Sequence, residues 1–294
     1  MTVDTAYKSG KSEHDENFPV ASRLIASRYR APILAFYRFA RAADDAADHT
    51  DLDAPAKFAI LDALEDTLLG KSDAAADARP LRDELRRRQL SPQHALDLLQ
   101  AFRQDVTKSR YETWDELVDY CRYSAMPVGR FVLDVHGESK ATWASSDALC
   151  TALQIINHLQ DCGKDYRDLD RVYIPQADLV RHGTDVSALG QSRSSPALLA
   201  CLREVGARTG KLLPEASRLP PHVTDLWLCM ETSVIVGLAR DLITLLDRRD
   251  PLADRVHFSK SRSALIAGRA AVSALAARVA GRRGIYQAVR DDAA

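Results

Sequence analysis

The chain has 294 residues, of which 46% are hydrophobic and 28% are charged, so it has enough apolar material for a sizeable core. Its 40 Lys and Arg residues balance 41 Asp and Glu residues, and the formal net charge of -1 gives no sign of a nucleic-acid partner. The five cysteines lie far apart and form no C-x-x-C pair, which argues against a zinc knuckle or a disulfide framework.

Helical periodicity runs through almost the whole sequence. Ala, Leu and Arg dominate, and alternating strand patterns bounded by turns are nearly absent. We predict helices over 19–49 (with a turn near 30–32), 53–69, 79–89, 91–108, 113–136, 144–169, 195–216, 221–247 and 262–290. None of the breaks is long or polar enough for an interdomain linker. We therefore predict one all-α domain over 1–294, with 1–17 as a candidate flexible segment.

The first predicted helix carries an acidic motif, Arg41-Ala-Ala-Asp44-Asp45-Ala-Ala-Asp48. Asp44 and Asp48 are four residues apart, so their carboxylates share one helix face, where oxygen ligands can bind Mg²⁺. Tyr37 and Arg41 extend the same row. Acidic pairs at this spacing occur by chance about six times in a chain of this composition. On its own, the motif therefore favours a solvated acidic face.

A second polar row lies on the predicted helix 144–169. Asn157, Asp161 and Asp165 follow at intervals of four residues, and Gln154 lies at nearly the same angle, within an otherwise apolar stretch. Such a row costs free energy unless it meets metal, partner groups or water. If the two acidic helices face each other, their carboxylates surround one pocket and repel, and bridging cations with a diphosphate would relieve that repulsion.

The segment after this helix reads Asp170-Arg171-Val172-Tyr173-Ile174-Pro175. An arginine about one turn beyond the acidic row can bind a diphosphate oxygen pair. The alternative for Arg171 is an ordinary helix-end arginine that meets the helix dipole. His158, which interrupts the apolar stretch, favours a hydrogen-bonded core histidine over a metal ligand.

Together, these motifs resemble those of the squalene/phytoene synthase family. The likeness runs from about residue 14 to residue 175, with the motifs in the family's order, and the C-terminal third is similar only in its helical character. It implies a single-domain isoprenoid synthase bundle with a central apolar cavity. It also implies an enzyme that binds an isoprenoid diphosphate with two or three Mg²⁺ ions.

The resemblance assigns roles to individual residues. The metal ligands that it implies are Asp44, Asp48, Asn157, Asp161 and Asp165. The substrate contacts that it implies are Asn17, Phe18, Tyr37, Arg41, Gln154, Asn157, Arg171 and Tyr173. The catalytic residues that it implies are Arg41, Asp44, Tyr123 and Asp161. Tyr123 would face a carbocation, and its alternative is a core tyrosine with a satisfied hydroxyl group.

Three places differ from the family members that join two prenyl diphosphates head to head, namely Glu16–Val20, Ser124–Arg130 and Gln160. They resemble the hydroxysqualene-forming branch of bacterial hopanoid pathways. That branch ionises presqualene diphosphate and captures the rearranged cation with water. The likeness implies that NADPH is not needed. It also implies hand-over of metabolites with a presqualene diphosphate synthase and an amine oxidase-like hydroxysqualene reductase.

Two alternatives remain within the family. One is a presqualene diphosphate or phytoene synthase that condenses two prenyl diphosphates. The other is a reductive squalene synthase, which needs a nicotinamide cofactor; the sequence has no G-x-G-x-x-G, but that enzyme uses no Rossmann site. In a different class, a non-catalytic helical scaffold would carry the Asp rows as solvated faces. Magnesium-dependent binding of diphosphate separates that scaffold from the enzymes.

The sequence also indicates a location. The N-terminal segment is polar and lacks the apolar core of a signal peptide. The most apolar stretch, Leu226 to Leu246, carries Glu231, Arg240 and Asp241 and is typical of a buried core helix. We expect a cytoplasmic protein. The basic segment 260–283 favours a docked helix, and peripheral contact with the inner face of the membrane is the alternative.

Overall fold

The computed structural model describes residues 26–258 and residue 268. Over this part of the chain the named elements are helices, and the β-type pairing is an isolated bridge between Arg110 and Val172. The α-helices are α1 Ser27–Asp48, α2 Ala54–Leu69, α3 Arg79–Arg88, α4 Gln93–Thr107, α5 Trp114–Ser124, α6 Met126–His136, α7 Trp143–Leu169, α8 Gln176–Arg181, α9 Pro196–Gly210, α10 Leu213–Ala216, α11 Leu219–His222 and α12 Leu226–Arg248. Two 3₁₀ turns join them, η2 Lys140–Thr142 and η3 Val186–Gly190. The predicted all-α fold is confirmed.

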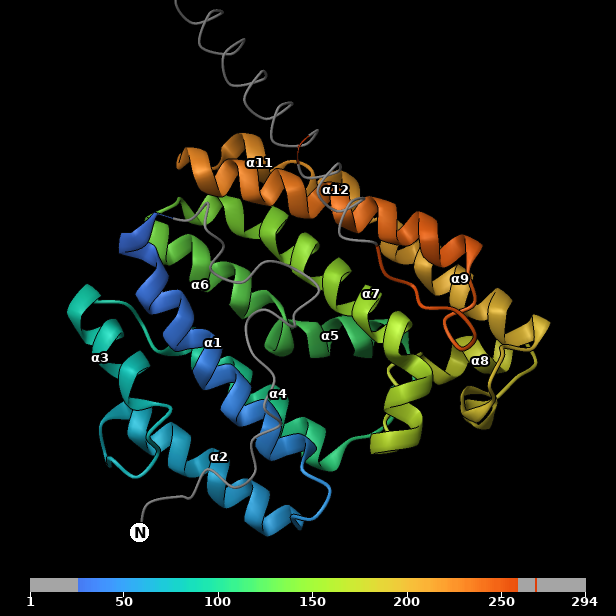
Figure 1. Ribbon diagram of the computed structural model, residues 1–294, viewed down its shortest axis with the longest axis horizontal. Helices are drawn as coiled ribbons and strands as arrows, with labels where there is room; N and C mark the ends of the chain where they lie inside the picture. Colours follow the sequence, from blue (N-terminus) through green and yellow to red (C-terminus); the bar gives the residue numbers. More distant parts are fainter. Residues whose placement is uncertain (1–25, 259–267, 269–294) are drawn as a thin grey trace, which may run out of the picture.

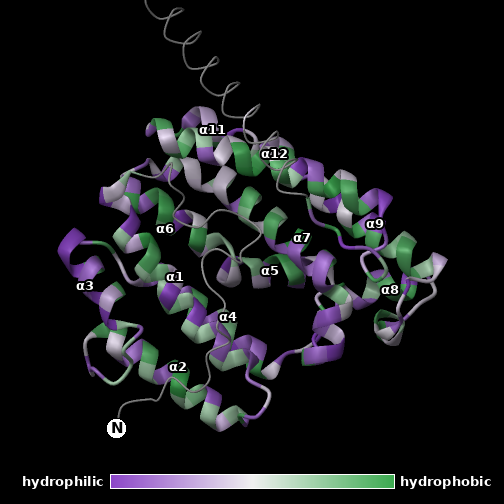
Figure 2. Ribbon diagram, in the orientation of Figure 1, coloured by the Kyte–Doolittle hydropathy of each residue, from purple (hydrophilic) through white to green (hydrophobic). Residues whose placement is uncertain are grey.

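The helices form two groups around α6. On one side α1 packs against α2, α3 and α4, and on the other α7 packs against α9 and α12 (Figure 1). Each group has its own cluster of buried apolar side chains. Helix α6 contributes to both, since Phe131 belongs to the first cluster and Leu133 to the second. Figure 2 shows hydrophilic residues along α3, which covers the outside of the first group.

The predicted turn near residues 30–32 is wrong, because α1 continues through Pro32. A proline inside a helix cannot donate a hydrogen bond to the carbonyl four residues earlier, which here belongs to Arg28. The Nη2 group of Arg88, at the end of α3, donates to that carbonyl instead. A side chain from another helix therefore supplies the bond that proline removes.

The predicted helix 113–136 is two helices. Helix α5 ends at Ser124, α6 begins at Met126, and Ala125 between them has φ -128° and ψ -48°. Pro127 lies in the first turn of α6, where its missing N–H costs nothing. Thr113 accepts the N–H of Glu116 at 3.2 Å and so defines the start of α5.

Other predicted boundaries also move. The predicted helix 221–247 begins at Leu226, because Asp225 accepts the N–H of Leu228 at 2.9 Å and caps it there. The predicted helix 195–216 ends at Gly210 and is followed by the short α10. Helix α8 and the turn η3 were not predicted. Apart from residue 268, the predicted helix 262–290 lies outside the described residues.

In the described part of the chain, no helix is both long enough and apolar enough to cross a bilayer.

Candidate active site

Helices α1 and α7 bring the two acidic motifs to one polar cavity of about 270 Å³. Six of the predicted site residues line it, namely Asp44, Asp48, Gln154, Asp165, Arg171 and Tyr173. They come from segments more than 100 positions apart in the sequence. These segments meet because α6 packs against α1 and α4 on one side and against α7 on the other. The cavity thus gathers carboxylates, an amide and an arginine.

Arg171 lies directly after α7 and is 7% exposed, so it is not a solvated helix-end arginine. Its Nη1 donates to Asp48 Oδ1 at 2.8 Å, and its Nη2 donates to the backbone carbonyl of Asp105 at 3.2 Å. Burial acts against the charge, yet Tyr173, Asp105 and Asp48 raise the pKa of Arg171 above its ordinary value. The cavity therefore contains a fixed positive charge.

Asp105, on α4, is a buried carboxylate of this cavity that the sequence analysis missed. It accepts the hydroxyl of Tyr120 at 2.7 Å and that of Tyr173 at 3.1 Å. Burial raises its pKa to about 6, although Arg171 and both hydroxyl groups oppose the shift. A signal was present in the sequence, because Asp105 lies seven residues after the buried Leu98, on the apolar face of the predicted helix 91–108.

One carboxyl group in each acidic row, Asp44 in the first and Asp165 in the second, has a raised pKa. Burial and the neighbouring Asp48 raise the pKa of Asp44 to about 7, although Arg41 at 3.1 Å lowers it. Burial and the neighbouring Asp161 raise the pKa of Asp165 to about 7. The side chain of Asp44 keeps 35% of its surface accessible, and it lines the cavity. These two carboxyl groups, with pKa values near 7, provide oxygen ligands that suit a hard cation.

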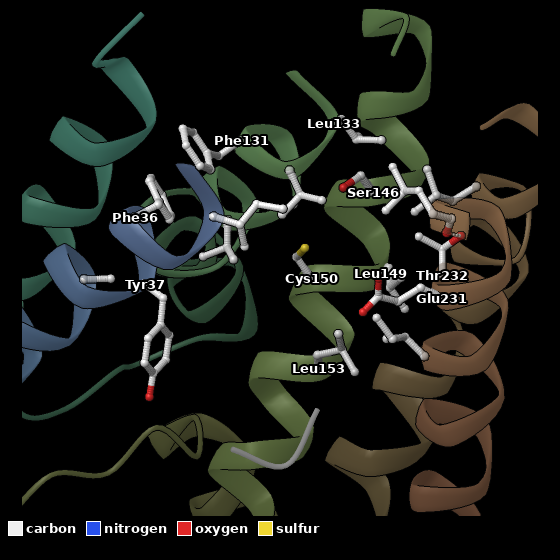
Figure 3. A pocket seen from close by; sticks show the side chains of 18 of the residues that line it. Phe36, Tyr37, Phe131, Leu133, Ser146, Leu149, Cys150, Leu153, Glu231 and Thr232 are labelled. Atoms are coloured by element: carbon white, nitrogen blue, oxygen red, sulfur yellow. Dashed lines mark hydrogen bonds between the residues drawn. The ribbon is translucent and has the colours of Figure 1, made fainter. Parts of the chain in front are cut away.

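A larger cavity of about 430 Å³ lies next to the polar one, and its walls are mostly apolar (Figure 3). Phe36 of α1 and Phe131 of α6 stack there with ring centroids 4.0 Å apart. Leu149 and Leu153 of α7 line it from the other core cluster. The predicted apolar cavity is thus confirmed, between the two core clusters. Two side chains, Asp44 and Phe102, line both cavities.

The other predicted residues lie elsewhere. Tyr37, Arg41 and Asn157 line the apolar cavity. Asp161 is half-buried on α7 and does not line either cavity. Tyr123 is half-buried on α5, packs against the core and is likewise absent from both linings. The predicted contacts Asn17 and Phe18 lie outside the described residues.

His158 lines the polar cavity, and its ring stacks on Tyr173 with the centroids 3.5 Å apart. Its buried Nε2 has no hydrogen-bond partner among the described residues, so the expectation of a hydrogen-bonded histidine is wrong for that atom. Burial and the nearby Arg171 lower its pKa to about 3. His158 is therefore a neutral aromatic wall beside Tyr173.

Two of the three places where this sequence differs from the head-to-head synthases, Ser124–Arg130 and Gln160, have visible structural roles. Ser124 lines the polar cavity, and Val128 and Gly129 line the apolar one. A Cβ atom on Gly129 would collide with Ser146 Oγ and Cys150 Sγ, so glycine allows α6 to approach α7 closely. Gln160 lines neither cavity and donates instead to the carbonyl of Val256.

Comparisons with known proteins agree with this geometry. Residues 11–262 match the family model described as squalene/phytoene synthase. The chain is 55% identical over 257 residues to the hydroxysqualene synthase of Rhodopseudomonas palustris, covering 87% of this chain and 88% of that protein. It is 54% identical over 259 residues to the hydroxysqualene synthase of Sinorhizobium fredii, with 88% and 89% covered.

Among solved structures, the squalene synthase HpnC from Alicyclobacillus acidocaldarius superposes with a TM-score of 0.70. It shares 32% sequence identity, and the match covers 80% of this chain and 89% of that one. The arrangement of helices is therefore the fold of these isoprenoid synthases.

Proposed function

Because the chain belongs to the squalene/phytoene synthase family and is an isoprenoid synthase, we propose that it converts presqualene diphosphate into hydroxysqualene. In this reaction the diphosphate leaves, the carbocation rearranges, and water captures it. The observation that carries the proposal is the wall shared by the two cavities, where Asp44 and Phe102 face both. A diphosphate in the polar cavity would there join a hydrocarbon body in the apolar one.

The polar cavity has the donor set for Mg²⁺. Asp44, Asp48 and Asp165 would hold the ions, with Asp161 and Asn157 as further candidate ligands. In the described residues, no three His, Cys, Asp or Glu side chains enclose an ion by themselves, so water and diphosphate oxygens would complete its coordination. Bound Mg²⁺ would stabilise the negative charge of the departing diphosphate.

The residues of the chain would divide the work as follows. Arg171 binds diphosphate oxygens from the polar cavity, and Arg41 binds them from the side of α1. Asp105 keeps Tyr120 and Tyr173 in place beside Arg171 through the two hydroxyl hydrogen bonds. Each fixed group would stabilise the charge that develops in the transition state. Such electrostatic stabilisation is the largest single source of catalysis in many enzymes.

The apolar cavity would protect the cation. Its phenylalanine and leucine walls keep bulk water away and hold the hydrocarbon in one conformation. The segment Ser124–Arg130, which resembles the water-quenching branch, contributes Ser124 to one cavity and Val128 and Gly129 to the other. The likeness of this cavity-lining segment to the water-quenching branch supports capture of the cation by water over condensation of two prenyl chains.

One incubation tests the proposal. The purified chain is mixed with presqualene diphosphate and Mg²⁺, and the products are identified by mass spectrometry. We expect hydroxysqualene and diphosphate, no reaction in excess chelator, and no change on adding NADPH, because capture by water needs no hydride. Efficient conversion of farnesyl diphosphate to presqualene diphosphate or a phytoene-like hydrocarbon would contradict the proposal. The family and the fold would stand in that case.

A further inference from the structure

The face of α12 that lines the apolar cavity carries a carboxyl group. The helical spacing of the apolar residues predicts an apolar side chain at that position. Leu228, Glu231, Thr232 and Ile235 follow at the spacing of one helix face, and all four line the cavity. Glu231 is 3% exposed, and both of its carboxyl oxygens are buried. Figure 3 shows its side chain directed from α12 towards Leu149 of α7.

A carboxylate in such surroundings is costly, since burial removes its hydration. Glu231 is the sixth residue of α12 and lines the space for hydrocarbon. Its position suits chemistry inside that space.

We propose that Glu231 holds the water molecule that quenches the rearranged cation and accepts the proton that this water releases. The inference rests on the proposed function. First, the C–O bond to the diphosphate breaks, and its electron pair leaves with the diphosphate. After rearrangement, a lone pair of the water forms a C–O bond to the cationic carbon. One proton of the resulting oxonium passes to a carboxylate oxygen of Glu231. The sum is substrate plus water giving alcohol, diphosphate and one proton, without oxidant or reductant.

The position of Glu231 explains why the rearranged cation, and not the first one, is captured. A water beside the leaving group would attack the cation as soon as it forms. Glu231 lies opposite Leu149, which is two helical turns along α7 from Asn157, or about 12 Å at 1.5 Å per residue. Residues 154 and 158 at that end of α7 line the polar cavity. The water is thus kept deep in the apolar cavity, away from the site of departure.

The replacement Glu231→Leu tests the proposal. Leucine fills the site with hydrocarbon, and replacing a buried charge by an apolar side chain of similar size is often neutral or stabilising, so the variant should fold. Diphosphate release and products are measured with presqualene diphosphate and Mg²⁺. We expect diphosphate release to continue, while the ratio of alcohol to hydrocarbon products falls on the order of 10²-fold. This ratio does not depend on how much of the enzyme is folded.

Ser233→Ala is the matched control on the same helix. Its hydroxyl donates within α12, to the carbonyl of Cys229 at 2.7 Å, and Ser233 is not among the cavity-lining residues, so its loss should leave the product ratio unchanged. Glu231→Gln keeps the shape and can still bind water, but it cannot accept a proton. We expect its alcohol fraction to lie between those of the wild type and Glu231→Leu.

The outcomes separate the two claims. If the wild type makes the alcohol and Glu231→Leu makes it in the same ratio, the inference about Glu231 is overturned and the proposed function stands. If Glu231→Leu loses the alcohol but Glu231→Gln keeps the wild-type ratio, proton transfer to Glu231 is overturned. If the wild type releases diphosphate without forming the alcohol, the proposed function itself fails.

Discussion

Asp105 organises one wall of the polar cavity although it belongs to neither acidic motif. Its side chain accepts two tyrosine hydroxyl groups, and its backbone carbonyl accepts from Arg171. Arg171 in turn donates to Asp48 of the first motif. Asp105 therefore connects Tyr120 of α5 with Tyr173 through its carboxylate, and its backbone carbonyl helps to orient the guanidinium group of Arg171, which reaches Asp48 of α1.

We predict that Asp105→Asn lowers kcat/KM for presqualene diphosphate on the order of 10²-fold, because small misplacements of positioning groups are costly in catalysis. The helical content, measured by circular dichroism, should stay unchanged. Asp97→Asn is the control, since Asp97 lies on the same helix, accepts from Gln93 at 2.7 Å and is not among the cavity-lining residues. Equal activity of the two variants would contradict a positioning role for Asp105.

The acidic rows were predictable from sequence at the level of single residues, whereas Asp105 and Glu231 left only an ambiguous signal there. Rows at intervals of four residues repeat a chemical type, so they are visible in one sequence. Asp105 and Glu231 are single polar residues within apolar helix faces, and such a residue has many explanations until the packing shows which cavity it lines. The position of Asp161 outside both linings likewise depends on how α7 is rotated about its axis.

At the scale of elements, prolines misled the prediction in opposite directions. Pro32 suggested a break, yet α1 continues because Arg88 replaces the lost hydrogen bond from 60 positions away. No break was predicted near Pro127, yet α5 ends at Ser124 and α6 begins at Met126. Long amphipathic helices such as α7 were predictable from their period, whereas compensation by a distant side chain is a property of the packed molecule.

We expect Arg88→Met to lower the free energy of unfolding by about 1–2 kcal/mol, because the carbonyl of Arg28 loses its donor. Urea denaturation followed by circular dichroism measures the change. Arg87→Met serves as the control, because Arg87 is mostly exposed and pairs with Glu84 at the surface. Its effect should stay within about 0.5 kcal/mol. A similar cost for both variants would mean that Arg88 acts only as a surface charge.

At the scale of the whole molecule, the polar cavity joins the two core clusters. Asp44 and Asp48 come from the side of α1, and Asp165 and Arg171 come from the side of α7. The ordinary pKa of an aspartate is 3.8, whereas the pKa values of Asp44 and Asp165 are about 7 in the folded protein. The folded chain therefore holds these protons more tightly than the unfolded chain does. The negative charges that form on Asp44 and Asp165 near neutral pH destabilise the junction between the two core clusters.

The sign of the pH dependence follows from these shifts. Because unfolding releases the two protons between about pH 3.8 and pH 7, their contribution to stability falls as the pH rises through that window and levels off above it. We predict that the melting temperature of the double variant Asp44→Asn, Asp165→Asn, relative to the wild type, is higher at pH 8 than at pH 5. Differential scanning calorimetry of metal-free protein measures this.

Mg²⁺ with inorganic diphosphate should reverse the effect at pH 8. At 100 times the dissociation constant, the ligands would stabilise the wild type by about 2.7 kcal/mol and leave the double variant nearly unchanged. Equal stabilisation of both proteins would exclude the two carboxylates as the ligands of the metal.

The hydrogen bond between Arg171 and Asp48 also has a consequence for the order in which ligands enter. Each partner already satisfies the other, so an incoming diphosphate must compete with Asp48 for the guanidinium group, and an incoming cation must compete with Arg171 for the carboxylate. When both arrive, the arginine turns to the anion and the aspartate to the cation, and no charge is left uncompensated. The pair therefore favours binding of the cation and the diphosphate together, and it disfavours binding of either ion alone.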